Sequence, residues 1–197
     1  QFYTLSNVGT SDLTGNKSVL HNLSVFTRFA DTALRGDLYF SEIMANPTPS
    51  VAGLPDAEYI EIFNPTDKVF SLKGCTLSDA SSTATLPDSI IMPGSYVSIS
   101  KNTATALTSY GPWIGLSSLP SLNNSGDKIT LRNHRGETIA FLEYTEAWHD
   151  DGLKKAGGWS LELIDTASAC LTKGNWRSNA VGGGTPGRRN SVAQNLN

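Results

Sequence analysis

Short stretches that alternate apolar and polar residues recur along the chain from position 38 to position 164. In YIEIF, Tyr59, Glu61 and Phe63 share one face of a strand, and Ile60 and Ile62 share the other. Similar stretches occupy positions 38–44, 69–72, 76–78, 83–86, 96–100, 128–132, 138–144 and 159–164. No long window keeps the 3.6-residue period of a helix. The pattern therefore predicts about eight short strands and an all-β chain.

Turn residues separate these stretches at regular intervals. Asn64-Pro65 stops one strand, because proline has no amide hydrogen for the ladder. Pro93-Gly94 fits a tight turn, and Asn133 to Gly136 separates two strands as a hairpin does. A short helix is expected only at positions 104–109. Many short strands with frequent turns close their core as a sandwich or a barrel.

The two ends of the chain differ from this middle part. Residues 1–36 predict one hairpin, which is too small to bury a core of its own. This piece is either an N-terminal β extension or the tail of a preceding Ig-like domain. Residues 37–192 are expected to form the main domain, and residues 193–197 a frayed C-terminus after a glycine-rich stretch.

Length and composition agree with one sandwich-sized domain. The chain has 197 residues, enough for a domain of roughly 150 residues and a smaller piece. Charged residues make up 17%, below the usual share of about 25%, and Ser, Thr, Asn and Gly fill the gap. The net charge is -3, whereas a nucleic-acid surface needs clustered Lys and Arg. We therefore expect no nucleic-acid partner.

Six stretches, in this order, resemble the bacterial lamin tail domain. They are FSEIMANPTP (40–49), AEYIEIFNPTDKVFSLKGCTLSD (57–79), ATLPDSIIMPGSYVSIS (84–100), SLPSLNNSGDKITLRNHRGETIAFLEY (118–144), GGWSLELID (157–165) and NWRSNAVGGGTPGRRNSV (175–192). The resemblance implies an immunoglobulin-like β-sandwich with the N-terminal hairpin as an extension. It also implies a non-catalytic binding or tethering module of the bacterial cell envelope. The alternative is an accessory, substrate-binding β-domain of a larger secreted hydrolase or nuclease.

The expected location is extracellular or at the cell surface, with a signal peptide that is not part of this chain. No apolar run reaches the roughly 18 residues of a transmembrane helix. The expected partner is an envelope component, either a glycan or a protein. The sequence does not indicate an oligomeric state.

The chain departs from the family pattern at Cys75, where the family usually has Trp after the glycine of the LKG stretch. Cys75 and Cys170 lie far apart and show no metal-ligand spacing. One interpretation is a disulfide between them, which fits an oxidising compartment. The other is two separate thiols, of which Cys75 replaces a large core side chain with a small one.

Candidate chemistry is sparse. No Ser lies in a nucleophile motif, and His21, His134 and His149 have no evident catalytic partner. Glu58 with Glu61, or Asp56 with Glu58, could form the pair of acids of a glycosidase, but exposed acids beside a strand are far more common. We therefore expect no enzyme, no cofactor and no metal site. Loop residues are the candidate ligand contacts: Trp113, Trp148, His149, Asp150 and Asp151.

Weak binding to duplex DNA is the outcome we expect from the net charge. At about 150 mM salt, titration followed by fluorescence anisotropy should show no submicromolar affinity, because phosphate attraction needs a positive surface. Submicromolar binding would contradict this expectation. It would also point to a local basic patch formed by Lys173, Arg177, Arg188 and Arg189.

Overall fold

The computed structural model describes residues 2–5, 13–15, 23–26, 29–51, 53–166 and 173–194. The chain divides into two compact units, Gln1–Ala30 and Asp31–Asn197. In the smaller unit, β1 (Phe2–Leu5) pairs antiparallel with β2 (Leu23–Phe26). Residues 31–36, which the sequence pattern grouped with the N-terminal extension, lie in the larger unit.

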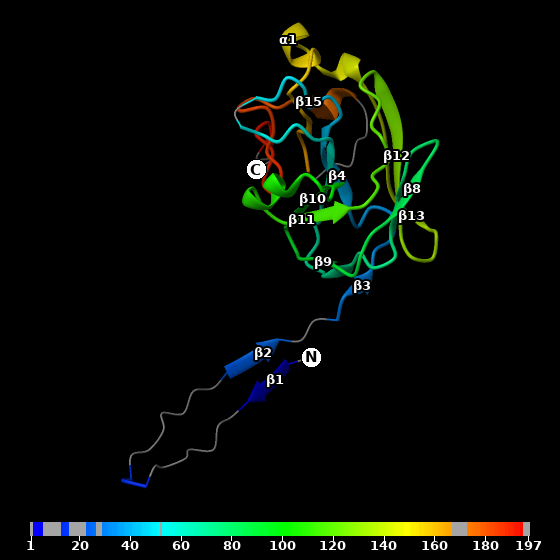
Figure 1. The fold of residues 1–197 in the computed structure, drawn as a ribbon. Coiled ribbons are helices and arrows are strands. Elements are labelled where there is room, and N and C mark those ends of the chain that lie inside the picture. Colours follow the sequence, from blue (N-terminus) through cyan, green and yellow to red (C-terminus); the bar gives the residue numbers. More distant parts are fainter. Residues whose placement is uncertain are drawn as a thin grey trace. The chain divides into compact units, whose positions relative to one another are not determined.

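The larger unit is built from two main sheets and one small one (Figure 1). The six-stranded sheet has the order β11 (Trp113–Leu116), β10 (Tyr96–Lys101), β5 (Tyr59–Phe63), β4 (Tyr39–Met44), β14 (Leu161–Leu163) and β15 (Trp176–Ser178). The four-stranded sheet has the order β13 (Thr138–Thr145), β12 (Gly126–Arg132), β7 (Thr76–Ser78) and β8 (Thr83–Thr85). The small sheet has the order β3 (Asp31–Thr32), β6 (Phe70–Ser71) and β9 (Ile90–Ile91). Pairing is antiparallel except for β10 with β11 and β3 with β6.

Within the described residues, helical structure is limited to short one-turn segments. These are η1 (Thr105–Ser109), η2 (Glu146–Trp148), α1 (Gly152–Lys155) and η3 (Lys173–Asn175). The prediction of an all-β sandwich is therefore confirmed, and η1 lies within the stretch where a short helix was expected. The sequence pattern missed β3, β9, β11 and β15, and it made the strand at β14 too long.

The apolar faces of the two main sheets form one core. Ile60 and Ile62 of β5 point into it, as their alternation predicts, and Leu77, Leu131 and Leu142 reach it from the opposite sheet. Full burial of such a side chain contributes roughly 1.5–3 kcal/mol. The core lies between the sheets, so one face of each sheet is left for other contacts.

Cys75 belongs to this core. It is 1% exposed, and its thiol lies 3.7 Å from the carbonyl oxygen of Ser71. Burial raises the pKa of the Cys75 thiol, so the unreactive protonated form is favoured. Cys170 lies outside the described residues, and the disulfide between the two cysteines stays a prediction.

The second face of the six-stranded sheet carries a row of three buried glutamates, which we call the carboxylate row: Glu42, Glu61 and Glu162. Glu162 of β14 lies opposite Glu42 of β4, and Glu42 lies opposite Glu61 of β5. Each is 0% exposed. The expectation that Glu61 is an exposed acid is wrong, because a segment from the far end of the chain covers this face.

Residues 183–192, the C-terminal segment, supply hydrogen bonds to the carboxylate row. The amide of Thr185 donates to Glu42 Oε1 at 2.8 Å, and the amide of Val192 donates to Glu162 Oε2 at 3.2 Å. The amide of Gly187 donates to Glu61 Oε2 at 2.5 Å. Backbone amides of an irregular segment therefore find buried acceptors, as buried polar groups require.

Side chains on and beside the sheet add further hydrogen-bond donors to the row. Tyr59 and Ser160 donate their hydroxyl groups to Glu42 Oε1 at 2.7 and 2.6 Å. Ser41 donates to Glu61 Oε1 at 2.8 Å, and Asn179 donates to Glu162 Oε1 at 2.6 Å. A register shift between Phe40 and Glu42 marks a β-bulge, which re-aims side chains at this point of β4.

Burial is the main influence on the pKa of two members of the row, Glu42 and Glu61. It raises the pKa of Glu42 to about 7, with a further contribution from the charge of Glu162, while hydrogen bonds from Ser160, Tyr59 and Thr185 act in the opposite direction. Burial likewise raises the pKa of Glu61 well above its usual range, and the charge of Glu42 adds to the effect. A buried carboxylate beside another carboxylate is harder to ionise, because burial and the like charge act in the same direction.

The stability of the fold should therefore rise as the pH falls from 7 toward 4.5. The pKa of Glu42 is raised from 4.5 to about 7, so the folded state binds its proton more tightly than the unfolded chain. The stabilisation is complete below the unfolded pKa and is lost as the pH rises through the folded one. One such group changes the free energy of unfolding by at most about 1.4 kcal/mol per pH unit. Thermal unfolding across this range measures it.

Glu42→Gln should flatten this pH dependence, because the amide keeps the shape of the side chain and does not titrate. Glu143→Gln, at an exposed site, should leave it unchanged. Burial lowers the pKa of His149, so this residue reduces the stability of the fold as the pH falls below 6.5. Because this effect is the same in all three proteins, the difference between their stability curves reports on Glu42. Equal slopes in the wild type and Glu42→Gln would contradict the assignment.

Candidate functional site

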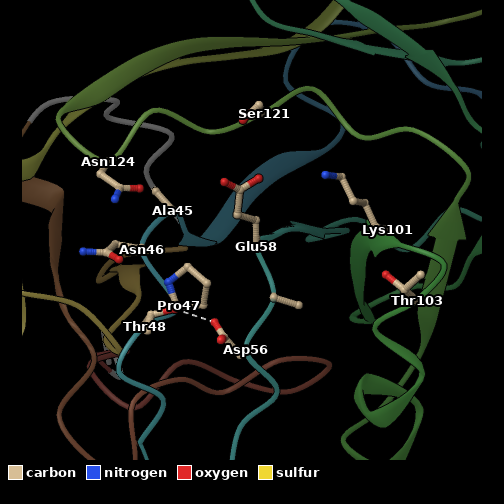
Figure 2. Close-up of a pocket in the computed structure, with 11 residues that line it drawn as sticks. Ala45, Asn46, Pro47, Thr48, Asp56, Glu58, Lys101, Thr103, Ser121 and Asn124 are labelled. Carbon is tan, nitrogen blue, oxygen red and sulfur yellow. Dashed lines mark hydrogen bonds between the residues drawn. The ribbon is translucent and has the colours of Figure 1, made fainter.

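A polar cavity of about 380 Å³ opens where three loops meet, and we call it the Glu58 cavity (Figure 2). The loop between β4 and β5 contributes most of its wall, and the end of β10 and the loop before β12 contribute the rest. The polar lining residues are Asn46, Thr48, Asp56, Glu58, Lys101, Thr103, Ser121 and Asn124. Small apolar surfaces of Ala45, Pro47 and Ala57 lie between them.

Hydrogen bonds hold the main loop of this cavity in place. The amide of Gly158 donates to the carbonyl of Asn46 at 2.7 Å, and the Asn46 side chain donates to the carbonyl of Ala156 at 3.2 Å. Thr48 Oγ1 donates to Asp56 Oδ1 at 2.6 Å, which ties the two sides of the loop together. The wall of the cavity is therefore positioned before any ligand arrives.

Two consecutive glycines allow this close approach. Gly157 and Gly158 have φ values of +132° and +78°, which side chains rarely adopt. A Cβ at either position would also meet backbone atoms of Thr48 or Pro49. The loop that lines the cavity therefore packs directly on the backbone of Gly157 and Gly158, and a larger residue at either position would displace it.

Glu58 is the central group of the cavity. Figure 2 shows its carboxylate pointing into the space below Ser121, with the ammonium group of Lys101 extending toward it. The amide of Leu122 donates to Glu58 Oε2 at 3.3 Å. Burial raises the pKa of Glu58, and the Leu122 amide and the charge of Lys101 oppose that rise. A half-buried carboxylate with one long hydrogen bond retains capacity to accept donors from a ligand.

The cavity offers carboxylate and amide groups that can bind hydroxyl-rich molecules. Its lining contains two acidic residues and one lysine, so acidic groups outnumber basic ones by one. Hydroxyl and amide side chains add both donors and acceptors. The arrangement suits directional hydrogen bonding to a polar ligand.

The candidate contacts chosen from the sequence lie elsewhere and apart from one another. Trp113 is on β11, at one edge of the six-stranded sheet, and its indole nitrogen donates to Ser100 Oγ at 2.7 Å. Trp148 is 8% exposed, and its ring lies 5.9 Å from that of Trp176 on β15, at the other edge. The width of the sheet therefore separates the two tryptophans.

His149, Asp150 and Asp151 lie near the β15 edge. His149 Nδ1 is 2.7 Å from Ser178 Oγ, and its ring is half-buried. Asp150 and Asp151 line a smaller cavity of about 280 Å³ together with Lys154 and Arg177. Asp151 also accepts a hydrogen bond from the amide of Leu153 and so caps α1. The role of these five residues as ligand contacts stays a prediction.

Sequence reasoning considered Asp56 and Glu58 only as a catalytic pair and missed the cavity they line. The signal available was local, namely acids that flank a strand beside a proline-rich loop. The fold brings these acids together with Lys101, Ser121 and Asn124. The spacing of these residues along the chain does not predict this proximity.

No helix in the described part of the chain has the length and apolar character needed to cross a membrane. Within the same residues, no three His, Cys, Asp or Glu side chains form a group suited to a metal ion.

The comparison with known families gives one match. The family model described as Lamin Tail Domain matches residues 31–146, more than half of the chain. It is a family of non-enzymatic, immunoglobulin-like β-domains. The resemblance to the lamin tail domain family is thereby confirmed, and the matched range contains the first four of the six sequence stretches. The bacterial type stays a prediction. The matched range contains every residue that lines the Glu58 cavity. A search of curated proteins found no match.

Lys101→Met should raise the pKa of Glu58 further, because the charge of Lys101 favours the ionised carboxylate. Carboxyl carbon shifts in an NMR pH titration measure this directly. Lys128→Met removes an equal charge from the pair with Glu143, outside the cavity, and should leave the pKa of Glu58 in place. An equal response to both variants would show that Lys101 does not face Glu58 in solution.

Proposed function

Because this chain belongs to the lamin tail domain family, we propose that it is a non-catalytic binding or tethering module of the bacterial cell envelope, acting outside the cell. Its ligand is a hydroxyl-rich glycan of the envelope, bound in the Glu58 cavity. As an accessory β-domain of a larger secreted hydrolase or nuclease, the module would use the same cavity to hold a substrate.

The polar lining of the Glu58 cavity carries this proposal. Sugar hydroxyls donate and accept at once, and a site for them needs carboxylate, amide and hydroxyl partners in one place. Glu58 supplies a half-buried acceptor, and Asn124 and Ser121 face the same space in Figure 2. Burying such groups without a partner is costly, so a ligand that pairs them gains affinity and selectivity.

The rigidity of the cavity wall supports a binding role. The loop bonds from Asn46 and Thr48 fix the wall in the free protein. A positioned site loses less conformational entropy when a ligand binds, so more of the contact energy appears as affinity. Rigid polar walls on a β-scaffold suit recognition.

Binding to envelope glycans tests the proposal. A panel of soluble glycans, including peptidoglycan fragments and neutral hexose oligomers, is titrated by calorimetry or applied as an array. The best ligand should bind Glu58→Gln about tenfold or more weakly, because a charge-assisted hydrogen bond contributes about 1.5–3 kcal/mol. Glu143→Gln, which changes an exposed carboxylate outside the cavity, should bind as the wild type does.

Two results would contradict the proposal. One is a panel without any binder, and the other is binding that Glu58→Gln leaves unchanged. Sedimentation with purified envelope fractions separates the tethering role from the accessory role. A tether should sediment with intact envelopes, whereas an accessory domain should follow the isolated polymeric substrate of its enzyme.

A further inference from the structure

A second cavity of about 570 Å³ lies wholly within the larger unit, and its chemistry differs from that of the Glu58 cavity. It opens between the start of β4 and the β12–β13 hairpin. Leu38, Phe40 and Ile139 line it and are at most 1% exposed. Tyr39 is half-buried, and Phe141 is 40% exposed. The apolar surface that a ligand can reach therefore comes from Tyr39, Ala140 and Phe141, and we call it the apolar floor.

Two arginines and no acidic residue line this space, which we call the arginine cavity. Arg132 Nη1 donates to the carbonyl of Gly136 at 3.1 Å and to Thr138 Oγ1 at 2.9 Å, so its guanidinium group is held in position. Arg35 lies in a turn whose next residue, Gly36, donates its amide to the carbonyl of Ile139 at 3.1 Å. Both cations are therefore attached to the same wall.

The acids near the cavity are engaged with other groups. Asp37 accepts the amide of Leu34 at 2.8 Å, and Glu137 accepts the side chain of Asn133 at 2.8 Å. Glu143 pairs with Lys128 at 3.2 Å. Among the described residues, neither Arg35 nor Arg132 forms an ion pair within 4.0 Å. Their charges are available to an anionic ligand.

We propose that the arginine cavity binds an acidic segment of a partner protein, with an apolar or aromatic side chain on the floor and carboxylates at Arg35 and Arg132. The two arginines select carboxylates, since guanidinium groups bind them in a bidentate way. The apolar floor favours a peptide over a glycan, because sugar hydroxyls would find few partners there. Exposed aromatic and arginine side chains are also the residue types that dominate protein interfaces.

The position of β13 fits an extended segment. β13 is an edge strand of the four-stranded sheet, with β12 as its neighbour on the other side. Gly36 already occupies the carbonyl of Ile139, so a bound segment would lie beside the part of β13 that follows Ile139. This inference does not rest on the glycan proposal, because it concerns other residues and a negatively charged peptide ligand.

The test uses a short synthetic peptide that alternates glutamate with phenylalanine, and an analogue with glutamine in place of glutamate. Calorimetric titration of the full chain should show binding of the glutamate peptide, and binding at least about tenfold weaker for the glutamine peptide. Arg35→Gln and Arg132→Gln should each weaken the glutamate peptide by a similar factor. The affinity should also fall as salt increases.

Arg135→Gln is the matched control, because Arg135 is exposed in the same hairpin and does not line the cavity. It should bind the glutamate peptide as the wild type does. Arg132 also donates a hydrogen bond within the hairpin, so the thermal stability of Arg132→Gln is measured as a control. If Arg132→Gln is destabilised, the binding result for Arg35→Gln decides the outcome. Phe141→Ser should weaken binding by removing the exposed ring.

Four results would overturn the proposal. The first is a glutamate peptide that does not bind, and the second is equal affinity for the glutamate and glutamine peptides. The third is an equal loss in Arg35→Gln and Arg135→Gln, which would show a general charge effect. Preferential binding to vesicles of anionic lipid would also contradict it, since a membrane surface is a different partner.

Discussion

Burial of three adjacent carboxylates is the constraint on which the larger unit depends. A charged or protonated carboxyl group inside a protein needs hydrogen bonds, or its desolvation cost remains uncompensated. The strands that carry Glu42, Glu61 and Glu162 cannot satisfy all of their oxygens alone. The C-terminal segment supplies the amides of Thr185 and Gly187, and it thereby acquires a fixed path without regular secondary structure. The second face of the six-stranded sheet becomes an interior for the same reason.

This packing extends from the carboxylate row to the Glu58 cavity through glycines. A Cβ on Gly184 would clash with the hydroxyl oxygen of Tyr59, and one on Gly183 would clash with the carbonyl oxygen of Gly158. Gly158 in turn holds the loop that bears Asn46. Glycines here allow backbone to lie on backbone, so the segment that covers the row also supports the loop that lines the cavity.

The sequence predicts the strands and turns that depend on neighbouring residues, and it does not predict contacts between residues far apart in the chain. Alternation and turn residues suffice for β5, β10 and the β12–β13 hairpin, because strand faces and turn geometry depend on neighbours in the chain. The same alternation places Glu61 on a polar face. Whether that face meets water depends on Gly187, far along the chain. β15 has only three residues and no alternation to detect, and the Glu58 cavity takes its residues from three loops that only the fold unites.

β4 connects these features physically. It begins at the arginine cavity with Tyr39 and Phe40, carries Glu42 in its middle, and ends beside Ala45 of the Glu58 cavity. Six residues of strand span about 20 Å. Two ligands at its ends would therefore not compete for space, and the hydrogen bonds that fix Glu42 fix the strand under both. The net charge of -3 does not reveal this separation of charge, in which acids line the Glu58 cavity and arginines line the other one. A module that holds a glycan and a protein at once needs two sites of different chemistry on one rigid element, and β4 is such an element.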